Sequence, residues 1–263
     1  MSASTPDLPR WDLAASSAVA PGARRRAELA ALPAGEPDLA TLFTFMRDAE
    51  LRFATLRLRI EERTWAAVER VETTEVLVRH PGLARVTTSV TGDGEPAGYD
   101  VWLGDGRTVR TYSTISRVTT ERPVRRRVGG LAEADLPGPA RVYEPLTALP
   151  METLAETFVH PAGFCQNVLT TGACRVAGRI AVAGREAVLV ECDHPRVVER
   201  YADLPDHRLE VAADDATGLV VRLVETIGGR PTRVAEAVSV EVDAPIPDSA
   251  FSLAVPADAH RIY

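Results

Sequence analysis

Residues 39–60 read LATLFTFMRDAELRFATLRLRI, and this stretch contains two kinds of hydrophobic periodicity. Over residues 39–53 the apolar side chains recur at helical spacing, and Asp38 precedes them as a capping residue. Over residues 56–60 apolar and charged side chains alternate, which predicts a strand with one solvated face. We therefore expect an amphipathic helix of about four turns that runs directly into a strand.

Strand patterns recur along most of the remaining chain. They cover residues 72–78, 83–90, 99–103, 108–114, 174–181, 186–192, 207–212, 219–225 and 231–242. Turn residues separate them, and Asp105-Gly106 is typical of a two-residue hairpin. Consecutive hairpins predict an antiparallel sheet, and a sheet of about ten to eleven strands curls. The expected fold class is α+β, mainly β: a half-open antiparallel β-barrel with helices plugging its concave face.

Three segments depart from the strand pattern. Residues 1–35 are rich in Ala, Ser, Pro and Arg, which predicts a flexible N-terminal arm ahead of a single domain over residues 36–263. Residues 151–168 have helical periodicity that breaks at His160-Pro161, which predicts two short helices. Residues 119–150 contain many Pro and Gly, which predicts a long loop across the sheet.

Composition and charge narrow the function classes. The formal net charge of −7 argues against a general nucleic-acid binder, which needs a basic surface. All basic residues are Arg, so Schiff-base chemistry on a Lys is excluded. We see no signal peptide and no apolar stretch long enough to cross a bilayer. The sequence therefore predicts a cytoplasmic protein, or an exported one if the start of the chain is misassigned.

The cysteines do not form a recognisable metal or disulfide framework. Cys165, Cys174 and Cys192 are an odd number, which predicts free thiols in a reducing compartment. A Cys165–Cys174 bridge is expected only for an exported protein. Together with His194 the three cysteines match no common zinc spacing, so we expect no metal and no cofactor.

No catalytic residue emerges from the ionisable side chains. The five histidines, His80, His160, His194, His207 and His260, occur in neither a nucleophile-elbow nor a zinc-protease pattern. The adjacent carboxylates Glu61-Glu62 and Asp214-Asp215 would face opposite sides of a strand, so neither pair forms an acid/base dyad. An enzymatic function is therefore the least supported class.

Bulky apolar side chains are the candidates for a ligand-binding surface. They are Phe43, Met46, Phe53, Trp65, Tyr99, Trp102, Phe158 and Phe164. A packed core and a ligand cavity use the same residue types, so these positions serve either purpose. The basic run Arg125, Arg126 and Arg127 is the candidate contact for an anionic head group or an acidic partner.

Several local patterns resemble the LolA-type carrier fold, which periplasmic lipoprotein carriers share with sigma-factor regulatory proteins of the RseB and MucB type. The matching segments are the helix and strand of residues 39–60, the turn Arg79-His80-Pro81-Gly82, LEVAADDATGLV over residues 209–220, and IPDSAF over residues 246–251. The resemblance implies an apolar concave surface that accepts acyl chains, with helices acting as a lid.

Three functional hypotheses follow from the sequence. The first is the binding of a lipid or other hydrophobic ligand, as a carrier or sensor, in a cavity between the curled strands and the helix over residues 39–53. The second is a regulatory module of the RseB type that binds a partner protein. The third is an enzyme of a specialised biosynthetic pathway that uses the same cavity.

Overall fold

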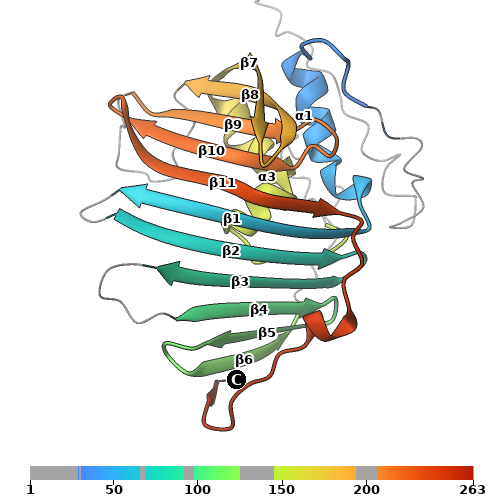
Figure 1. The fold of residues 1–263 in the computed structure, drawn as a ribbon, viewed down its shortest axis with the longest axis vertical. Helices are drawn as coiled ribbons and strands as arrows, with labels where there is room; N and C mark the ends of the chain where they lie inside the picture. The colour runs from blue at the N-terminus through green and yellow to red at the C-terminus, as the bar shows by residue number, and fades with distance from the viewer. Residues whose placement is uncertain are drawn as a thin grey trace, which may run out of the picture.

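A computed structural model describes residues 29, 31–65, 69–91, 98–124, 145–193 and 206–262. One twelve-stranded sheet dominates the described part (Figure 1). Its strands are β1 (Thr55–Trp65), β2 (Glu69–Arg79), β3 (Leu83–Thr91), β4 (Tyr99–Asp105), β5 (Thr108–Ser113), β6 (Val118–Pro123), β7 (Ala173–Val182), β8 (Arg185–Asp193), β9 (Arg208–Asp214), β10 (Val220–Ile227), β11 (Arg230–Val242) and β12 (His260–Ile262). The helical segments are α1 (Leu39–Arg47), η2 (Ala49–Arg52), α2 (Leu154–Val159), α3 (Pro161–Asn167), η4 (Leu169–Thr171) and η5 (Asp248–Phe251).

The strands are ordered β12-β6-β5-β4-β3-β2-β1-β11-β10-β9-β8-β7 across the sheet. β1 pairs with β2 on one side and β11 on the other, which joins the two meanders of the chain at the centre. Only the β12–β6 pair is parallel among the described strands. β7 and β12 are the two edges, so the sheet does not close. The predicted half-open, mainly β fold is confirmed.

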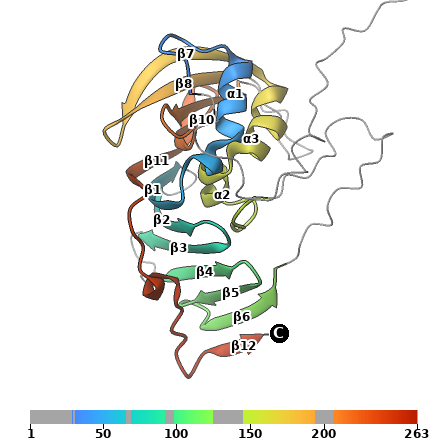
Figure 2. The same cartoon turned by 90° about the vertical axis from the view of Figure 1, so that its right-hand side faces the viewer.

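The helices cover only part of one face of the sheet. Figure 2 shows α1, α2 and α3 beside the strands from β7 to β2, while none of these three helices lies beside β4, β5 or β6. α2 and α3 meet at His160-Pro161, which confirms the predicted break. The concave side of the sheet is therefore closed by helices at one end and left open at the other.

The first helix is shorter than the sequence predicts. Its start is as expected, because the Asp38 side chain accepts a hydrogen bond from the Thr41 N–H at 2.8 Å. However, α1 ends at Arg47, and a 3₁₀ turn replaces the last two turns of the expected helix. The Arg52 guanidinium donates to the Phe45 carbonyl at 2.9 Å, which satisfies one carbonyl group at the helix end.

A packed core fills the space between the helices and the sheet. α1 contributes Leu42 and Met46, and α2 contributes Phe158; all three side chains are fully buried. They pack against the apolar rows of the central strands, including Leu56 and Ile60. The cavity that we expected between the first helix and the strands is thus occupied by core side chains, and the open part of the concave face lies elsewhere.

Two strands were not predicted. β6 lies within the segment that we expected to be a loop, and it pairs with β5 from Val118 to Pro123. Its sequence, VTTERP, has no apolar alternation and little of it is buried, so no periodic signal marks it. β12 has three exposed residues and pairs with β6. Residues 125–144 of the expected loop lie outside the described residues, and residues 145–150 contain no helix or strand, as predicted.

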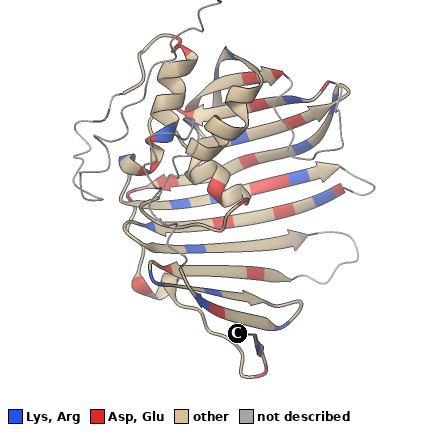
Figure 3. Ribbon diagram, turned by 180° about the vertical axis from the view of Figure 1, so that it is seen from behind, with Lys and Arg blue, Asp and Glu red and all other residues tan. Residues whose placement is uncertain are grey.

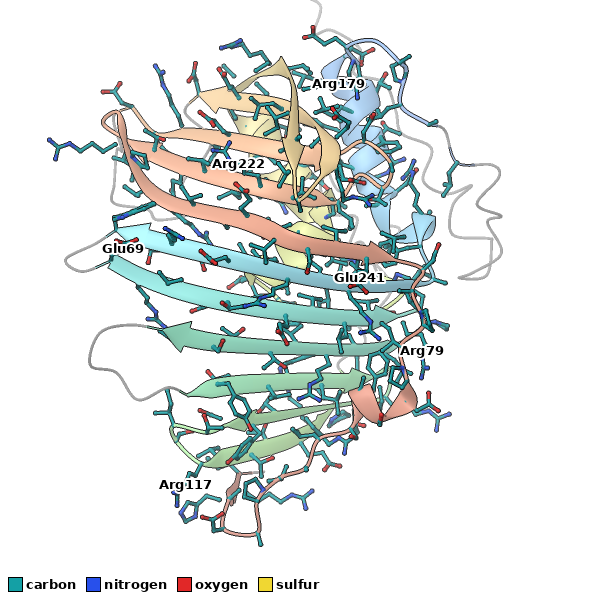
Figure 4. All side chains as sticks on the ribbon, viewed as in Figure 1. Glu69, Arg79, Arg117, Arg179, Arg222 and Glu241 are labelled. Atoms are coloured by element: carbon teal, nitrogen blue, oxygen red, sulfur yellow. The ribbon has the colours of Figure 1, made fainter. Side chains whose placement is uncertain are left out.

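The outer face of the sheet is charged and solvated. Arg222 on β10 lies 3.3 Å from both Glu210 on β9 and Glu236 on β11 (Figure 4). Exposed ion pairs of this kind contribute little to stability. Their charged side chains indicate that this face of the sheet is in contact with solvent. The C-terminal tail covers one patch of the sheet, where Ile246 and Phe251 pack against Leu103.

Candidate ligand-binding cleft

The part of the concave face that the helices leave uncovered contains an open cleft of about 570 Å³. Its walls come from β1 to β6, from β11 and from the segment that leads into α2. The lining residues are Glu62, Glu72, Thr74, Val86, Thr88, Asp100, Val101, Trp102, Thr111, Tyr112, Ser113, Ser116, Val118, Pro150, Glu152, Thr153, Leu154, Ala155 and Arg233. The volume lies within the usual range of small-molecule sites in proteins.

Strand register makes one end of the cleft apolar and the other polar. One row of cross-strand neighbours over β2 to β5 is mainly apolar and consists of Val76, Val86, Trp102 and Thr111. The next row on the same face is polar and consists of Thr74, Thr88, Asp100 and Ser113. Beyond it, Glu62 and Glu72 lie directly opposite one another on β1 and β2. Polarity therefore rises along the strands, away from the core.

Carboxylates dominate the polar end of the cleft. Figure 3, which views the molecule from behind, shows acidic positions on these central strands. Arg233 forms an ion pair with Glu62, and Arg70 lies 3.5 Å from Glu72. Burial raises the pKa of Glu72, and the negative charges of Glu62 and Asp100 add to that rise, against the two arginines. The polar end thus favours a positively charged or hydrogen-bonding group over an anion.

Trp102 separates the cleft from the core. Its side chain packs against the core cluster and also lines the cleft. The indole lies over the backbone of Gly104, because a Cβ at that position would be 2.6 Å from Cη2 of Trp102. Glycine at residue 104 therefore allows the ring to lie close to the sheet, with the cleft beyond it.

The start of α2 forms the opposite wall. Thr153 caps this helix, with its hydroxyl accepting from the Glu156 N–H at 3.3 Å. The Glu156 carboxylate in turn accepts from the Glu152 N–H at 2.6 Å, an arrangement related to a capping box. These reciprocal bonds hold the backbone at Glu152 and Thr153, both of which line the cleft.

A buried polar network anchors the segment ahead of this wall. The Thr147 hydroxyl bonds to His80 Nδ1 at 2.7 Å, and the Thr147 carbonyl accepts from His160 Nε2 at 2.9 Å. His160 Nδ1 lies 3.4 Å from the Glu50 carboxyl, which also accepts from the Leu146 N–H at 2.9 Å. Since Pro150 lines the cleft, this network fixes the approach to one of its walls.

Burial makes both ionisable partners in this network neutral near pH 7. It raises the pKa of Glu50 to about 8, with the nearby charge of Asp48 adding to the rise and the Leu146 N–H opposing it. It lowers the pKa of His160 to about 4, with His80 adding to the fall and the Thr147 carbonyl opposing it. The contact at 3.4 Å is therefore one between a protonated carboxyl and a neutral imidazole, and not a full ion pair.

These shifts predict a loss of stability in mildly alkaline solution. Between about pH 6.5 and 8 the unfolded chain has released the Glu50 proton and the folded protein retains it, so the free energy of unfolding falls as pH rises. At about 1.4 kcal/mol per pH unit the loss is about 2 kcal/mol. From about pH 4.5 to 6.5 the effects of Glu50 and His160 on the free energy of unfolding have opposite signs, because Glu50 keeps its proton in the folded protein and His160 binds one only in the unfolded chain. Urea unfolding of the wild type and of Glu50→Gln at several pH values checks this prediction. The variant should not lose stability between about pH 6.5 and 8. Parallel curves of unfolding free energy against pH for the two proteins would contradict it.

The structure distributes the bulky residues named from the sequence over three environments. Met46, Phe53 and Phe158 are buried in the core, and Phe43 and Phe164 pack against its edge. Trp65 and Tyr99 are exposed on hairpin ends, at 39% and 46% of their maximal areas. Trp102 alone among them lines the cleft. The run Arg125, Arg126 and Arg127 lies outside the described residues.

The polar end of the cleft is not among the sites that the sequence predicts. A signal for it exists on β1 and β2, where the inward-facing row continues past the apolar residues as Glu62 on one strand and as Thr74 and Glu72 on the other. A carboxylate that continues an apolar row marks where a covered face becomes an open one. Glu61 and Glu62 are adjacent in the strand, so Glu61 faces the other side of the sheet, as expected. There it forms an ion pair with Arg63 at 2.8 Å.

The described residues show neither a metal cluster nor a membrane-spanning helix. They bring no three His, Cys, Asp or Glu side chains together in a way that would hold a metal ion. Among the helices described, none is long and apolar enough to cross a membrane.

Comparison with solved structures finds similar folds at low sequence identity. The Pseudomonas aeruginosa MucA/MucB complex matches with 17% identity and a TM-score of 0.46, over 81% of this chain and 60% of that chain. The Mycobacterium tuberculosis lipoprotein LppX matches with 11% identity and a TM-score of 0.41, over 80% and 98%. A LolA superfamily protein from Nitrosomonas europaea matches with 11% identity and a TM-score of 0.32, over 82% and 98%.

The chain spans about 62% of the length of the MucB structure that it matches. No family model and no curated protein sequence matches the chain. The architecture nevertheless agrees with the resemblance found in the sequence, since one open antiparallel sheet curves around helices on its concave side. The described residues thus have the kind of architecture that the resemblance to the LolA-type fold implies.

Proposed function

We propose that the cleft binds a small amphiphilic molecule, such as a lipid with a cationic or uncharged polar head. The observation that carries this proposal is the graded lining, which is apolar beside Trp102 and acidic beside Glu72 and Asp100. The apolar part of the ligand would contact Trp102 and Val86, where burial of apolar surface supplies most of the affinity. The head would face the carboxylates, which disfavour the anionic head of a fatty acid.

Isothermal titration calorimetry with three amphiphiles of equal chain length tests this proposal. Decylamine, decanol and decanoate are titrated below their micellar concentrations into the wild-type protein. We expect saturable binding in the order decylamine, decanol, decanoate. Absence of binding by all three would contradict the proposal, and a stoichiometric polypeptide co-purifying with the protein would favour the regulatory hypothesis instead.

Two kinds of variant separate the apolar end of the cleft from the acidic end. Trp102→Ala should weaken decylamine and decanol at least tenfold, because the loss of a large apolar contact costs about 1.5–3 kcal/mol. Glu72→Gln should weaken decylamine about fivefold and leave decanol unchanged, since a partly exposed charge pair contributes about 1 kcal/mol. Trp65→Ala, which changes an exposed indole outside the cleft, is the matched control and should bind as the wild type does.

A further inference from the structure

Two cysteines lie directly opposite one another near an edge of the sheet. Cys174 on β7 is the register partner of Cys192 on β8, and β7 is an edge strand. Residues in this position of an antiparallel pair have Cα atoms about 4.5 or 5.5 Å apart. Both spacings lie within the range that disulfides require, about 4.4–6.8 Å. The register of the two strands is therefore compatible with a disulfide between these residues.

The two thiol groups also converge on one point. Cys174 Sγ lies 2.9 Å from the Leu169 carbonyl oxygen, and Cys192 Sγ lies 3.5 Å from the same atom. Both side chains are thus on the same face of the sheet and directed at η4. The third cysteine, Cys165 on α3, has its Sγ 3.9 Å from Met46 Sδ and contacts α1. Geometry thus singles out one pair among the three thiols.

We propose that Cys174 and Cys192 are a dithiol that closes to a disulfide when the protein meets an oxidant of the disulfide class. In the reducing cytoplasm that the sequence predicts, the pair stays as two thiols and donates to Leu169. In an oxidising compartment the bond ties the edge strand to its neighbour. This matters at β7, because a bulge between Val176 and Gly178 interrupts its pairing with β8.

Glutathione disulfide can form the Cys174–Cys192 bond by thiol–disulfide exchange. The half-buried Cys174, as thiolate, attacks one sulfur of glutathione disulfide and releases one glutathione thiolate, which leaves a mixed disulfide on the protein. The Cys192 thiolate then attacks the Cys174 sulfur and releases the second glutathione. The two cysteines lose two protons and two electrons, and glutathione disulfide takes up both. Burial raises the pKa of both thiols, so the exchange is slow.

Peptide mapping of the full chain tests the proposal. The protein is incubated with glutathione disulfide, remaining thiols are alkylated, and the digest is analysed by mass spectrometry. We expect one linked peptide pair that contains Cys174 and Cys192, with Cys165 alkylated. Cys165→Ala should give the same link, and Cys174→Ser should give none. A link through Cys165, or two unlinked thiols after prolonged exposure, would overturn the proposal.

Thermal unfolding provides a second readout that does not depend on the digest. A disulfide that closes the loop from Cys174 to Cys192 should raise the Tm of the oxidised protein by about 5–10 °C over the reduced form. Cys165→Ala should show the same rise and Cys174→Ser should show none. Equal Tm values for oxidised and reduced wild type, despite a mapped link, would contradict its stabilising role at the edge strand.

Discussion

Replacing Asp214 by alanine should lower the free energy of unfolding by about 3–5 kcal/mol, because it removes one partner of a buried ion pair. The Asp214 side chain is 1% exposed and ends β9. Its two oxygens accept from Arg185 Nε at 2.6 Å and Nη2 at 3.0 Å. They also accept from the Thr217 N–H at 2.8 Å and hydroxyl at 2.6 Å, which shapes the turn into β10. Alanine leaves a guanidinium and a buried N–H without these acceptors.

The adjacent carboxylate is the matched control. Asp215 pairs with Arg179 at 2.6 Å, but its side chain is 34% exposed. Asp215→Ala should therefore cost at most about 1 kcal/mol. Chemical unfolding of both variants at neutral pH measures the difference. If the two substitutions cost the same, the buried turn at Asp214 does not have the role assigned to it here.

Gly218→Ala is expected to cost about 3 kcal/mol through two separate effects. Gly218 has φ of +79°, a conformation that costs a residue with a Cβ about 1–2 kcal/mol. An added Cβ would also lie 2.9 Å from the Phe45 carbonyl oxygen and 3.1 Å from Met46 Cα. Both contacts are with the backbone of α1, which has little freedom to move, so overpacking adds about 1–3 kcal/mol.

Gly228→Ala separates the two effects. Gly228 also has a positive φ, +56°, but a Cβ there would meet nothing within 4 Å. Its substitution should therefore show only the backbone cost, about 1–2 kcal/mol. The excess for Gly218→Ala, measured by urea unfolding, reports the close approach of the β9–β10 hairpin to the first helix. An excess near zero would contradict that approach.

Hydrophobic periodicity predicted most of the sheet because its central strands have one buried face. In β1 the side chains of Leu56, Leu58 and Ile60 alternate with charged ones because they form the face that the helices bury. The same logic fails for β6, where neither face is well covered and no alternation is needed. The end of α1 was missed for a different reason, since its interruption depends on tertiary contacts such as that of Arg52.

The position of the cleft was not predictable from residue type. Trp102 and Phe158 are equally suitable for a core, and only the extent of helix cover decides that one lines a cleft and the other is buried. Helix cover depends on how far α1 and α2 extend over the sheet, which is a property of the whole fold. The network around His160 is similarly non-local, because its partners come from residues 50, 80 and 147.

The indole N–H signals in a proton–nitrogen NMR spectrum test the cleft directly. The chain has three tryptophans, and Trp→Phe variants assign their signals. During a titration with decylamine, the Trp102 signal should shift saturably and the exposed Trp65 signal should stay in place. A spectrum in which Trp102 does not respond, or in which Trp65 shifts instead, would show that the amphiphile does not occupy the cleft.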